Sequence, residues 1–377
     1  MPSTLMLLSN PHRTDPRVLR ESRALVAAGY RVTVVAWDRD SGGDSETEEE
    51  GVRIIRLGPG SPYRSPGKVF AGLVMFWAKA FRKSMGLDFD VVHCHDFDTL
   101  PLGKAIACLR RRPVLYDAHE VYSNMVKKDA ARAAMALWPI EKSLSSTADE
   151  IVTVNEGMAD ILSRRRKAPA RLVRNSPDLS AIAGVDDGET RRNYGLEGFV
   201  VSYLGSLEPG RSVEELATIF SPEDGVTVVI GGAGTLRPFV EEKAAENPCV
   251  HFIGQVGTDE ALRITCASDL VPAVHDPTNP NYVMGTPIKV LEAMACGRAV
   301  ITSRGIDISA VVEGAGCGFV IEYGPRQLRE TIMSASRSPA KLAEMGRLGA
   351  DYYRHHLSWD LSRAELLDAY RALTGPA

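Results

Sequence analysis

Short apolar segments alternate with segments of helical period along most of the chain, and the alternation begins twice. A polar stretch, residues 178–198, separates the two series and is the expected linker. Because strand–helix alternation is typical of a parallel sheet with helices on both faces, the pattern predicts an α/β fold. We expect two tandem Rossmann-like, doubly wound parallel-sheet domains with a cleft between them, at the carboxyl ends of the strands. The strand candidates are Thr4–Leu8, Arg31–Ala36, Val52–Leu57, Asp90–Cys94, Pro113–Tyr116, Ile151–Val154, Leu172–Arg174, Phe199–Leu204, Thr227–Ile230, Val250–Ile253, Leu270–Val274, Ala299–Thr302 and Phe319–Ile321.

Length and composition agree with two globular domains. A chain of 377 residues is long for a single hydrophobic core, and 44% hydrophobic with 24% charged residues is ordinary for a soluble protein. No apolar run reaches transmembrane length, and the first residues lack the pattern of a signal peptide. The six cysteines form no CxxC pair and mostly lie in apolar stretches, so we expect reduced thiols in a cytoplasmic protein.

The charge is unevenly distributed along the chain. Residues 1–177 hold 27 Lys and Arg against 21 Asp and Glu; the chain totals are 44 and 48, which leaves 17 against 27 for the rest. A basic first half indicates that one domain faces something anionic, although scattered surface arginines would give the same excess. The acidic segment 41–50 is the low-complexity stretch, and we expect a solvated, mobile loop there.

Residues 68–83 are unusually apolar and aromatic and are flanked by lysine and arginine. The segment is too short to span a bilayer, but it could lie in a membrane interface. A core helix between two strands is the favoured interpretation, with Val69, Leu73, Phe76 and Trp77 on its buried face.

Residues 284–301 predict a loop, a helix and a strand in one short run. Thr286 can cap the helix, Pro287 fits its first position, and Gly297 supplies a left-handed residue after its end. The start of a helix presents free N–H groups and the positive end of the helix dipole, so it attracts phosphate. Lys289 and Glu292 lie within this helix. The combination indicates a nucleoside diphosphate held by its phosphates and its ribose hydroxyls.

Residues 287–301 resemble the donor-binding signature of retaining glycosyltransferases with the GT-B fold, the group 1 transferases. Segments that agree in order and spacing are residues 29–34, 90–96, 116–120, 201–207, 231–234 and 252–256. The resemblance implies transfer of a hexose-type sugar from a UDP- or GDP-linked donor to a hydroxyl of a glycan or lipid-linked glycan. It also implies an acceptor-side domain over residues 1–177, a donor domain over 178–356, and a last helix, 357–377, packing back on the first domain.

The resemblance assigns residues to the donor. Glu292 would bind both ribose hydroxyls, which suits a carboxylate, and the nucleotide base would lie near Val256. Met284 stands where the family often has an acid that contacts the sugar, a departure from the pattern, but the backbone N–H groups of Met284, Gly285 and Thr286 could still hold the sugar or the diphosphate.

The resemblance also implies positively charged side chains beside the leaving diphosphate. Ser206 stands where the family has an arginine, so Arg211 and Lys289 would supply the positive charge on the diphosphate. These two cations would replace the metal ion of other transferases, and no metal cofactor is expected.

The remaining candidates belong to the first domain. His119 would touch the donor sugar near the reacting carbon, and Glu120 beside it is a weaker candidate for a helix cap. His12, Arg17 and His95 would line the acceptor side, and a structural salt bridge is an equally good role for Arg17.

Three motifs resemble sites of other protein classes, but we do not assign those functions to the chain. His93-x-His95-Asp96 has metal-ligand spacing, but we find no further histidine–carboxylate cluster in the sequence to complete it, so we interpret it as a strand end lining the cleft. Asp96-Phe97-Asp98 mimics the motif of metal-dependent transferases, which have a different, single-domain layout. Residues 231–234 are not a dinucleotide fingerprint in the opening βα unit, which argues against a dehydrogenase.

Two other functions remain compatible with the sequence. A nucleotide-sugar epimerase can share the two-domain fold, and Met284 is also compatible with an inactive nucleotide-sugar-binding protein. No nucleic-acid partner is expected. A peripheral contact of the first domain with the inner face of a membrane fits its basic charge and the segment 68–83.

Overall fold

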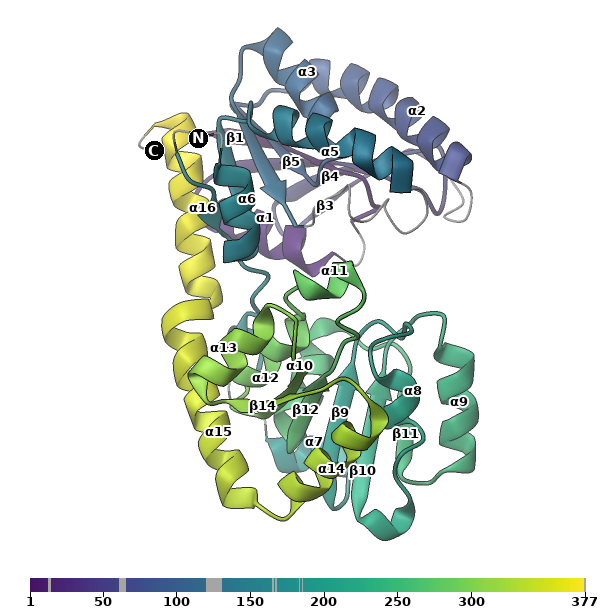
Figure 1. The fold of residues 1–377 in the computed structure, drawn as a ribbon. Helices are drawn as coiled ribbons and strands as arrows, with labels where there is room; N and C mark the ends of the chain where they lie inside the picture. Colours follow the sequence, from purple (N-terminus) through teal and green to yellow (C-terminus); the bar gives the residue numbers. More distant parts are fainter. Residues whose placement is uncertain are drawn as a thin grey trace. The chain divides into compact units, whose positions relative to one another are not determined.

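The computed structural model describes residues 1–12, 15–60, 66–119, 131–164, 166, 168–182, 184 and 186–375. The chain divides into two compact units, which we call the N-unit, Met1–Asn175 with Asp360–Ala377, and the C-unit, Ser176–Trp359. The sequence had placed these boundaries after residues 177 and 356. Each unit holds one largely parallel sheet (Figure 1), so the predicted α/β fold class with two such domains is confirmed.

The N-unit sheet has the strand order β3-β4-β2-β1-β5-β6-β7-β8, and all its neighbouring strands are parallel except β3 and β4. The helices follow the strands in the manner of a doubly wound fold. The strands are β1 (Ser3–Leu8), β2 (Arg31–Trp37), β3 (Ser45–Glu49), β4 (Val52–Leu57), β5 (Val91–His95), β6 (Val114–Ala118), β7 (Glu150–Thr153) and β8 (Arg171–Leu172). The helices are α1 (Pro16–Ala27), α2 (Pro66–Met85), α3 (Leu100–Arg110), α5 (Ala131–Ser145), α6 (Glu156–Ser163) and α16 (Trp359–Thr374).

The first helix has the ends that its sequence predicts. The Asp15 side chain accepts a hydrogen bond from the amide of Val18, and Pro16 occupies the first helical position. Gly29, just past the end, has a φ of 85°. Capping side chain, proline and left-handed glycine are local signals, so they could be read without the tertiary structure.

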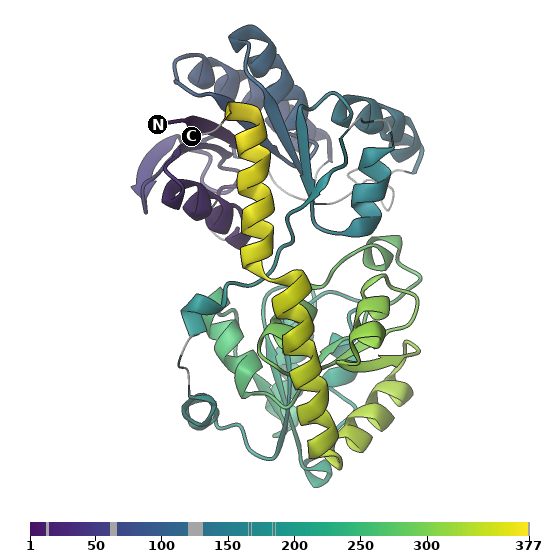
Figure 2. The same ribbon diagram turned by 90° about the vertical axis from the view of Figure 1, so that its left-hand side faces the viewer.

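The last helix, α16, returns to the N-unit and runs along it (Figure 2). Tyr370 on this helix is fully buried, and its hydroxyl lies 3.0 Å from Thr4 Oγ1 and 3.0 Å from His93 Nδ1. The C-terminal end of the chain therefore supplies a core residue to a unit built mainly from the first 175 residues.

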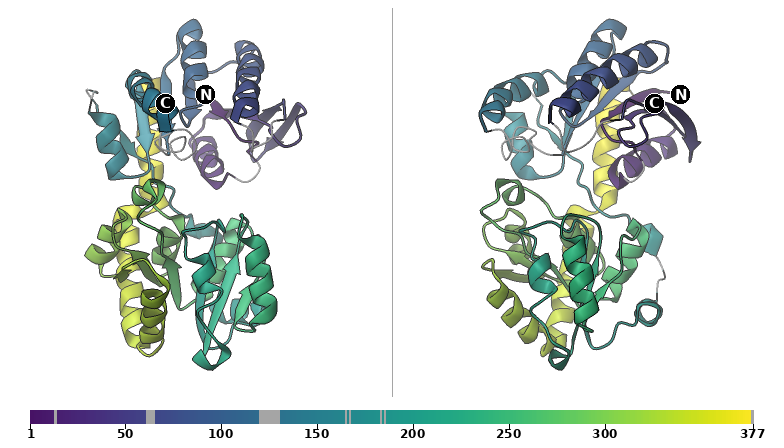
Figure 3. Two further views of the ribbon diagram at one scale, coloured as in Figure 1. Left: turned by 45° about the vertical axis from the view of Figure 1, so that its right-hand side comes forward. Right: turned by 90° about the vertical axis from the view of Figure 1, so that its right-hand side faces the viewer.

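Helix α2 packs as a core helix, as the favoured interpretation of residues 68–83 predicted. Leu73 and Phe76 are buried, Phe76 stacks on Trp37 with ring centroids 5.7 Å apart, and Val69 and Trp77 are half-buried. Figure 3 shows α2 beside α3. On its other face α2 exposes three large apolar residues: Phe70, Val74 and Met75. None of the helices in the described part of the chain combines the length and apolar character needed to span a bilayer.

The expectation of a loop over residues 41–50 is wrong for half of the segment. Ser45–Glu49 forms the edge strand β3, antiparallel to β4, with every residue exposed. Ion pairs hold it in place: Arg53 pairs with Glu46 at 2.7 Å and Arg56 with Glu49 at 3.3 Å. The acidic side chains are solvated as expected. The ion pairs with the neighbouring strand order the backbone, and the strand propensity of single residues does not include such contacts.

The C-unit sheet has the order β11-β10-β9-β12-β13-β14, and all its strands are parallel. Its strands are β9 (Phe199–Leu204), β10 (Val226–Gly231), β11 (Val250–Phe252), β12 (Leu270–Ala273), β13 (Ala299–Ser303) and β14 (Gly318–Ile321). Its α-helices are α7 (Asp187–Tyr194), α8 (Val213–Leu216), α9 (Arg237–Glu246), α10 (Thr258–Ala267), α11 (Pro280–Val283), α12 (Ile288–Ala295), α13 (Ile308–Ala315), α14 (Pro325–Ser336) and α15 (Pro339–Tyr352). The expected linker 178–198 contains α7, which packs on α10.

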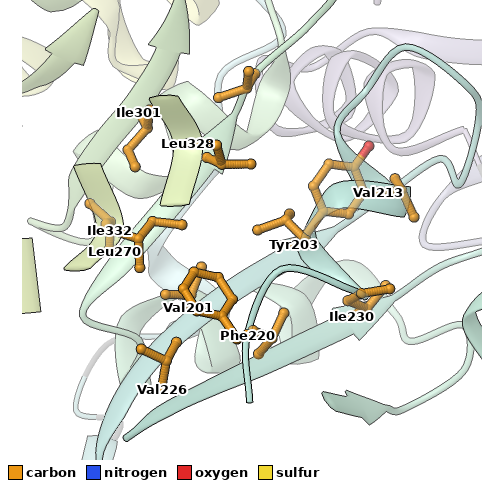
Figure 4. Close-up of a cluster of buried hydrophobic side chains, with 14 of the residues drawn as sticks. Val201, Tyr203, Val213, Phe220, Val226, Ile230, Leu270, Ile301, Leu328 and Ile332 are labelled. Atoms are coloured by element: carbon orange, nitrogen blue, oxygen red, sulfur yellow. The ribbon is translucent and has the colours of Figure 1, made fainter. Parts of the chain in front are cut away.

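Side chains from all six of these strands contribute to the core on one side of the C-unit sheet, part of which Figure 4 shows. Tyr203 of β9 is fully buried there, and its hydroxyl donates a hydrogen bond to the carbonyl of Ser206 at 2.8 Å. The six cysteines are all free thiols, three of them buried. A tight core directly beneath the strand ends fixes the loops that follow them.

We expect the Phe76→Ala variant to lower the free energy of unfolding by about 3–5 kcal/mol, because it removes a fully buried ring that stacks on Trp37. The matched control is Phe70→Ala on the same helix, where the ring is 66% exposed and the change should stay within about 0.5 kcal/mol. Urea unfolding measures both. Equal losses in the two variants would contradict the assignment of the buried face.

Candidate active site

Asp117, near the end of β6, organises the charged side chains of the N-unit. Its Oδ2 lies 2.9 Å from Nδ1 of His95 and 2.9 Å from Nε2 of His119. Asp117 and His95 are fully buried, whereas the side chain of His119 is 11% exposed. Burial opposes ionisation of Asp117, but the charge of His119 and the hydrogen bonds from both histidines outweigh it, so the pKa of this carboxyl lies well below its usual range. Asp117 therefore acts as an anion that orients His119.

Arg17 takes the structural role that the sequence left open. Its guanidinium pairs with Asp96 at 3.4 Å and with Asp15 at 3.5 Å. Burial alone would lower the pKa of Arg17, but Asp96 and Asp15 raise it, so the arginine remains charged. Its contact with an acceptor stays a prediction.

His12 is a second histidine in this loop region, and it is 6% exposed. Its backbone has a φ of 52°, in the left-handed region, and its amide donates to the side chain of Asn10 at 2.9 Å. Burial lowers the pKa of His12, so the ring is neutral near pH 7. The proposed acceptor role of His12 stays a prediction, and Glu120 lies outside the described residues.

The sequence analysis found no carboxylates to complete the motif formed by His93 and His95, and this was wrong. Glu21 on α1 and Asp117 on β6 bring two buried carboxylates to these histidines, with ligand atoms of all four residues within 4.8 Å of one another. The parallel pairing of β5 and β6 sets His95 opposite Asp117, which a sequence reader could have inferred from the two strand predictions. The position of Glu21 depends on how α1 lies on the sheet, and no local signal gives it.

In the C-unit, glycines let the loops after β9 and β10 pack directly on each other. Gly205, Gly232 and Gly234 have φ angles of 146°, 142° and 158°. A Cβ on Gly232 would lie 1.7 Å from the carbonyl oxygen of Gly205, and one on Gly234 would lie 2.3 Å from that of Leu207. Only glycine fits at these positions, and the resulting bare backbone permits close approach of a ligand.

Helix α12 begins one residue later than the sequence predicted. Pro287 occupies the N-cap position with an extended ψ of 117°, so it is not the first helical residue, and no side chain of the described residues caps the helix there. The expected capping role of Thr286 is therefore wrong. Gly297, with a φ of 66°, ends the helix as predicted, and β13 follows it.

The face that α12 buries carries charge. Lys289 is 7% exposed and Glu292 is 9% exposed. The ammonium of Lys289 lies over the ring of Tyr203, 4.1 Å from its centroid. Burial and the nearby charge of Arg211 lower the pKa of Lys289 to about 8, although Glu292 opposes the shift.

Arg211 comes from the loop after β9 and lies on an aromatic support. Its guanidinium is 5.0 Å from the ring centroid of Tyr282, and its Nε donates a hydrogen bond to the hydroxyl of Tyr282 at 3.3 Å. The Tyr282 hydroxyl in turn donates to the carbonyl of Pro209 at 3.1 Å. This arrangement fixes the direction of the guanidinium before any ligand binds.

His275 is a residue that the sequence analysis missed. It follows β12, is 4% exposed, and its Nε2 has no hydrogen-bond partner among the described residues. Burial, followed by the charges of Lys289 and Arg211, lowers the pKa of His275 to about 3. His275 is therefore a neutral ring beside two cations. Its position directly after a predicted strand could have identified it from the sequence as a candidate site residue.

The other predicted donor residues surround this charged group in the C-unit. Met284, Gly285, Thr286 and Val256 are half-buried, and Ser206 is exposed. The structure thus brings Arg211, Lys289 and Glu292 together, while His119 belongs to the N-unit. The contacts of all these residues with a donor stay predictions.

Two family models match consecutive parts of the chain and together cover most of it. The glycosyl transferase 4-like domain matches residues 14–177, and the model described as glycosyl transferases group 1 matches residues 198–337. The chain belongs to the group 1 glycosyltransferases with the GT-B fold.

Curated relatives agree with this assignment. A D-inositol 3-phosphate glycosyltransferase of Corynebacterium glutamicum is 24% identical over 94% of this chain and 90% of its own length. An alpha-maltose-1-phosphate synthase of Mycolicibacterium smegmatis is 24% identical over 75% of this chain and 79% of its own length.

Solved structures show the same fold. The sucrose-phosphate synthase of Thermosynechococcus elongatus superimposes with a TM-score of 0.79 at 19% identity, covering 99% of each chain. The Anabaena protein Alr3699/HepE, solved in complex with UDP and glucose, gives a TM-score of 0.75 at 16% identity over 99% of this chain and 100% of its own.

We expect the Gly232→Ala variant to be destabilised by about 1–3 kcal/mol, since the new methyl group would overlap the carbonyl oxygen of Gly205 and force the two loops apart. Gly257→Ala is the control, because a Cβ there meets nothing within 4 Å among the described residues and its φ is −70°. Thermal unfolding measures the stability of both variants. A Gly232→Ala protein as stable as the control would show that the loops do not need glycine.

Proposed function

We propose that this glycosyltransferase moves a hexose-type sugar from a nucleoside diphosphate sugar to an acceptor hydroxyl, with retention of the anomeric configuration. The observation that carries the proposal is the charged group of the C-unit: Lys289 and Arg211 beside the nine-tenths buried Glu292, at the carboxyl ends of β9 and β12. Two cations suit a diphosphate, and a carboxylate suits the two hydroxyls of a ribose.

In this reaction the bond between the anomeric carbon and the diphosphate oxygen breaks, and the acceptor oxygen bonds to the same face of the sugar. The departing phosphate takes the proton of the acceptor hydroxyl. Lys289 and Arg211 stabilise the charge that develops on the diphosphate, so the transfer needs no metal ion at the diphosphate.

His119 fits a role at the sugar. Its Nε2 is hydrogen-bonded to Asp117, which holds the ring in one orientation. Because Nε2 is taken by Asp117, Nδ1 is left to form a hydrogen bond with a sugar hydroxyl. We propose this contact in place of the acid that the family has at Met284.

The relatives support a UDP-linked donor as the first to test. HepE was solved with UDP and with UDP-glucose, and the related D-inositol 3-phosphate glycosyltransferase and alpha-maltose-1-phosphate synthase point to phosphorylated acceptors. A GDP-linked donor is tested beside it. For the acceptor we propose a glycan, a sugar phosphate or a lipid-linked glycan. The exposed apolar residues Phe70, Val74 and Met75 on α2 favour the lipid-linked glycan, with the protein in the cytoplasm at the inner membrane face.

The deciding experiment incubates the purified full chain with radiolabelled UDP-hexose or GDP-hexose, with and without these acceptors, and without added Mg²⁺ or Mn²⁺. We expect label on an acceptor only when the acceptor is present, with the donor's anomeric configuration in the product. An isomerised donor or free sugar formed without acceptor would identify an epimerase, and binding without turnover a non-catalytic protein. An inverted product, or transfer only with added metal, would contradict the mechanism.

We expect the Glu292→Gln variant to bind UDP about 10–100-fold more weakly, because the amide replaces the charged acceptor of two hydrogen bonds. The matched control is Glu313→Gln on α13, an exposed glutamate whose change should leave the affinity within twofold. Isothermal titration calorimetry measures both. An unchanged affinity in Glu292→Gln would remove the ribose role.

The affinity for UDP should also depend on pH through Lys289. Its pKa of about 8 means that the ammonium is charged below pH 8 and loses its proton as the pH rises through that value. We therefore expect the dissociation constant to rise between pH 7 and pH 9.5. The Lys289→Met variant, which lacks the titrating group, should bind weakly with a flat profile over this range. Parallel profiles for both proteins would contradict the contact with the diphosphate.

A further inference from the structure

The N-unit contains a cluster of four buried side chains from three elements, which we call the His–carboxylate cluster: Glu21 of α1, His93 and His95 of β5, and Asp117 of β6. One ligand atom of each residue lies within 4.8 Å of the others. All four residues are at most 1% exposed. The rings of His93 and His95 stack with centroids 4.1 Å apart, so both imidazoles face the same side of the sheet.

Three polar atoms of this cluster lack hydrogen bonds. Glu21 Oε2 and the Nε2 atoms of both histidines have no hydrogen-bond partner among the described residues. Glu21 Oε2 is 3.9 Å from His93 Nε2, too far for a hydrogen bond, whereas His95 and His119 hold the Asp117 carboxylate. Buried polar atoms without partners are costly, so three of them in one cluster favour a ligand.

The outer hydrogen bonds direct the lone pairs of both histidines inward. His95 uses Nδ1 toward Asp117 Oδ2 at 2.9 Å, and an ionised carboxylate can only accept, so this nitrogen carries the proton. His93 Nδ1 lies 3.0 Å from the hydroxyl of Tyr370, which also lies 3.0 Å from Thr4 Oγ1. When the Tyr370 hydroxyl accepts the hydrogen bond from His93 Nδ1, the Nε2 atoms of both histidines have a free lone pair, as in metal-binding histidines.

The chemical groups of the cluster also suit a cation. Glu21 and Asp117 bring two carboxyl groups to one buried place beside two imidazole rings. The guanidinium of the nearby Arg17 is paired with Asp15 and Asp96.

We propose that the His–carboxylate cluster binds one divalent transition-metal ion, with Zn²⁺ as the best fit. Two imidazole nitrogens and two carboxylate oxygens suit Zn²⁺, whereas Mg²⁺ and Ca²⁺ prefer oxygen ligands alone. Tetrahedral ligands at about 2.1 Å from Zn²⁺ are about 3.4 Å apart, so the side chains have to converge by roughly 1 Å. The ion would tie α1, β5 and β6 together and hold Asp117. It does not take part in binding the diphosphate, which we assign to the C-unit.

Metal binding to the full chain tests this inference, with a readout independent of sugar transfer. Protein freed of metal with a chelator is titrated with Zn²⁺, and with Co²⁺ as a spectroscopic probe, both in the folded state and during refolding because the cluster is buried. We expect one equivalent to bind, an increase in the melting temperature, and the intense visible absorption of four-coordinate Co²⁺. A weak, six-coordinate Co²⁺ spectrum with no change in melting temperature in either protocol would overturn the proposal.

Variants locate the ion. Glu21→Gln and His95→Gln should each weaken Zn²⁺ binding at least tenfold and abolish the thermal shift. His355→Gln combined with His356→Gln is the control for surface binding, because these adjacent histidines are exposed, and it should bind as the wild type does. Loss of binding in the control alone would place the ion at the surface and overturn the proposal. If one cluster variant fails to fold, as shown by circular dichroism, the other variant and the wild-type titration still decide.

Discussion

The buried positive charge of Lys289 is the constraint on which the C-unit site depends. An ammonium group that is 7% exposed has lost most of its hydration, and the neighbouring Arg211 increases the cost of its charge. The ring of Tyr203 and the carboxylate of Glu292 offset part of this cost. Under the proposed function, a diphosphate at the same place would offset the rest, and the electrostatic cost of the free protein would contribute to its affinity for the donor.

The loops around this charge are rigid for a geometric reason. Glycines after β9 and β10 let backbone pack on backbone, and the hydrogen bonds from Gly205 to Gly231 and from Leu207 to Ala233, at 2.8 and 2.9 Å, join the two loops. Arg211 is in turn held by Tyr282, and the neutral ring of His275 fills the space beside it. The site is therefore arranged before a ligand arrives, which lowers the conformational entropy lost on binding.

The sequence predicts best those features that depend only on residues close together in the chain. The ends of α1 depend on Asp15, Pro16 and Gly29 alone, so the sequence itself indicates both ends. The start of α12 was misplaced by one residue because Pro287 fits either the cap or the first turn, and its ψ is decided by the packing of the preceding loop. The edge strand β3 has acidic residues of low strand propensity and forms because arginines of β4 pair with them. The burial of Glu292 fits its apolar neighbours in the sequence. The burial of Lys289 over Tyr203, the aromatic support of Arg211 and the place of His275 required the fold.

The N-unit shows why long-range geometry matters most for chemistry. Its His–carboxylate cluster joins α1, β5 and β6, and the hydroxyl of Tyr370 from α16 lies 3.0 Å from Nδ1 of His93. Residues 21, 93, 95, 117 and 370 thus span almost the whole chain. Because α16 follows the C-unit in the sequence, the contact between Tyr370 and His93 can form only after the C-unit has been synthesised. The completed N-unit therefore depends on both ends of the chain, and the orientation of Asp117 beside His119 depends on a core that includes the last helix.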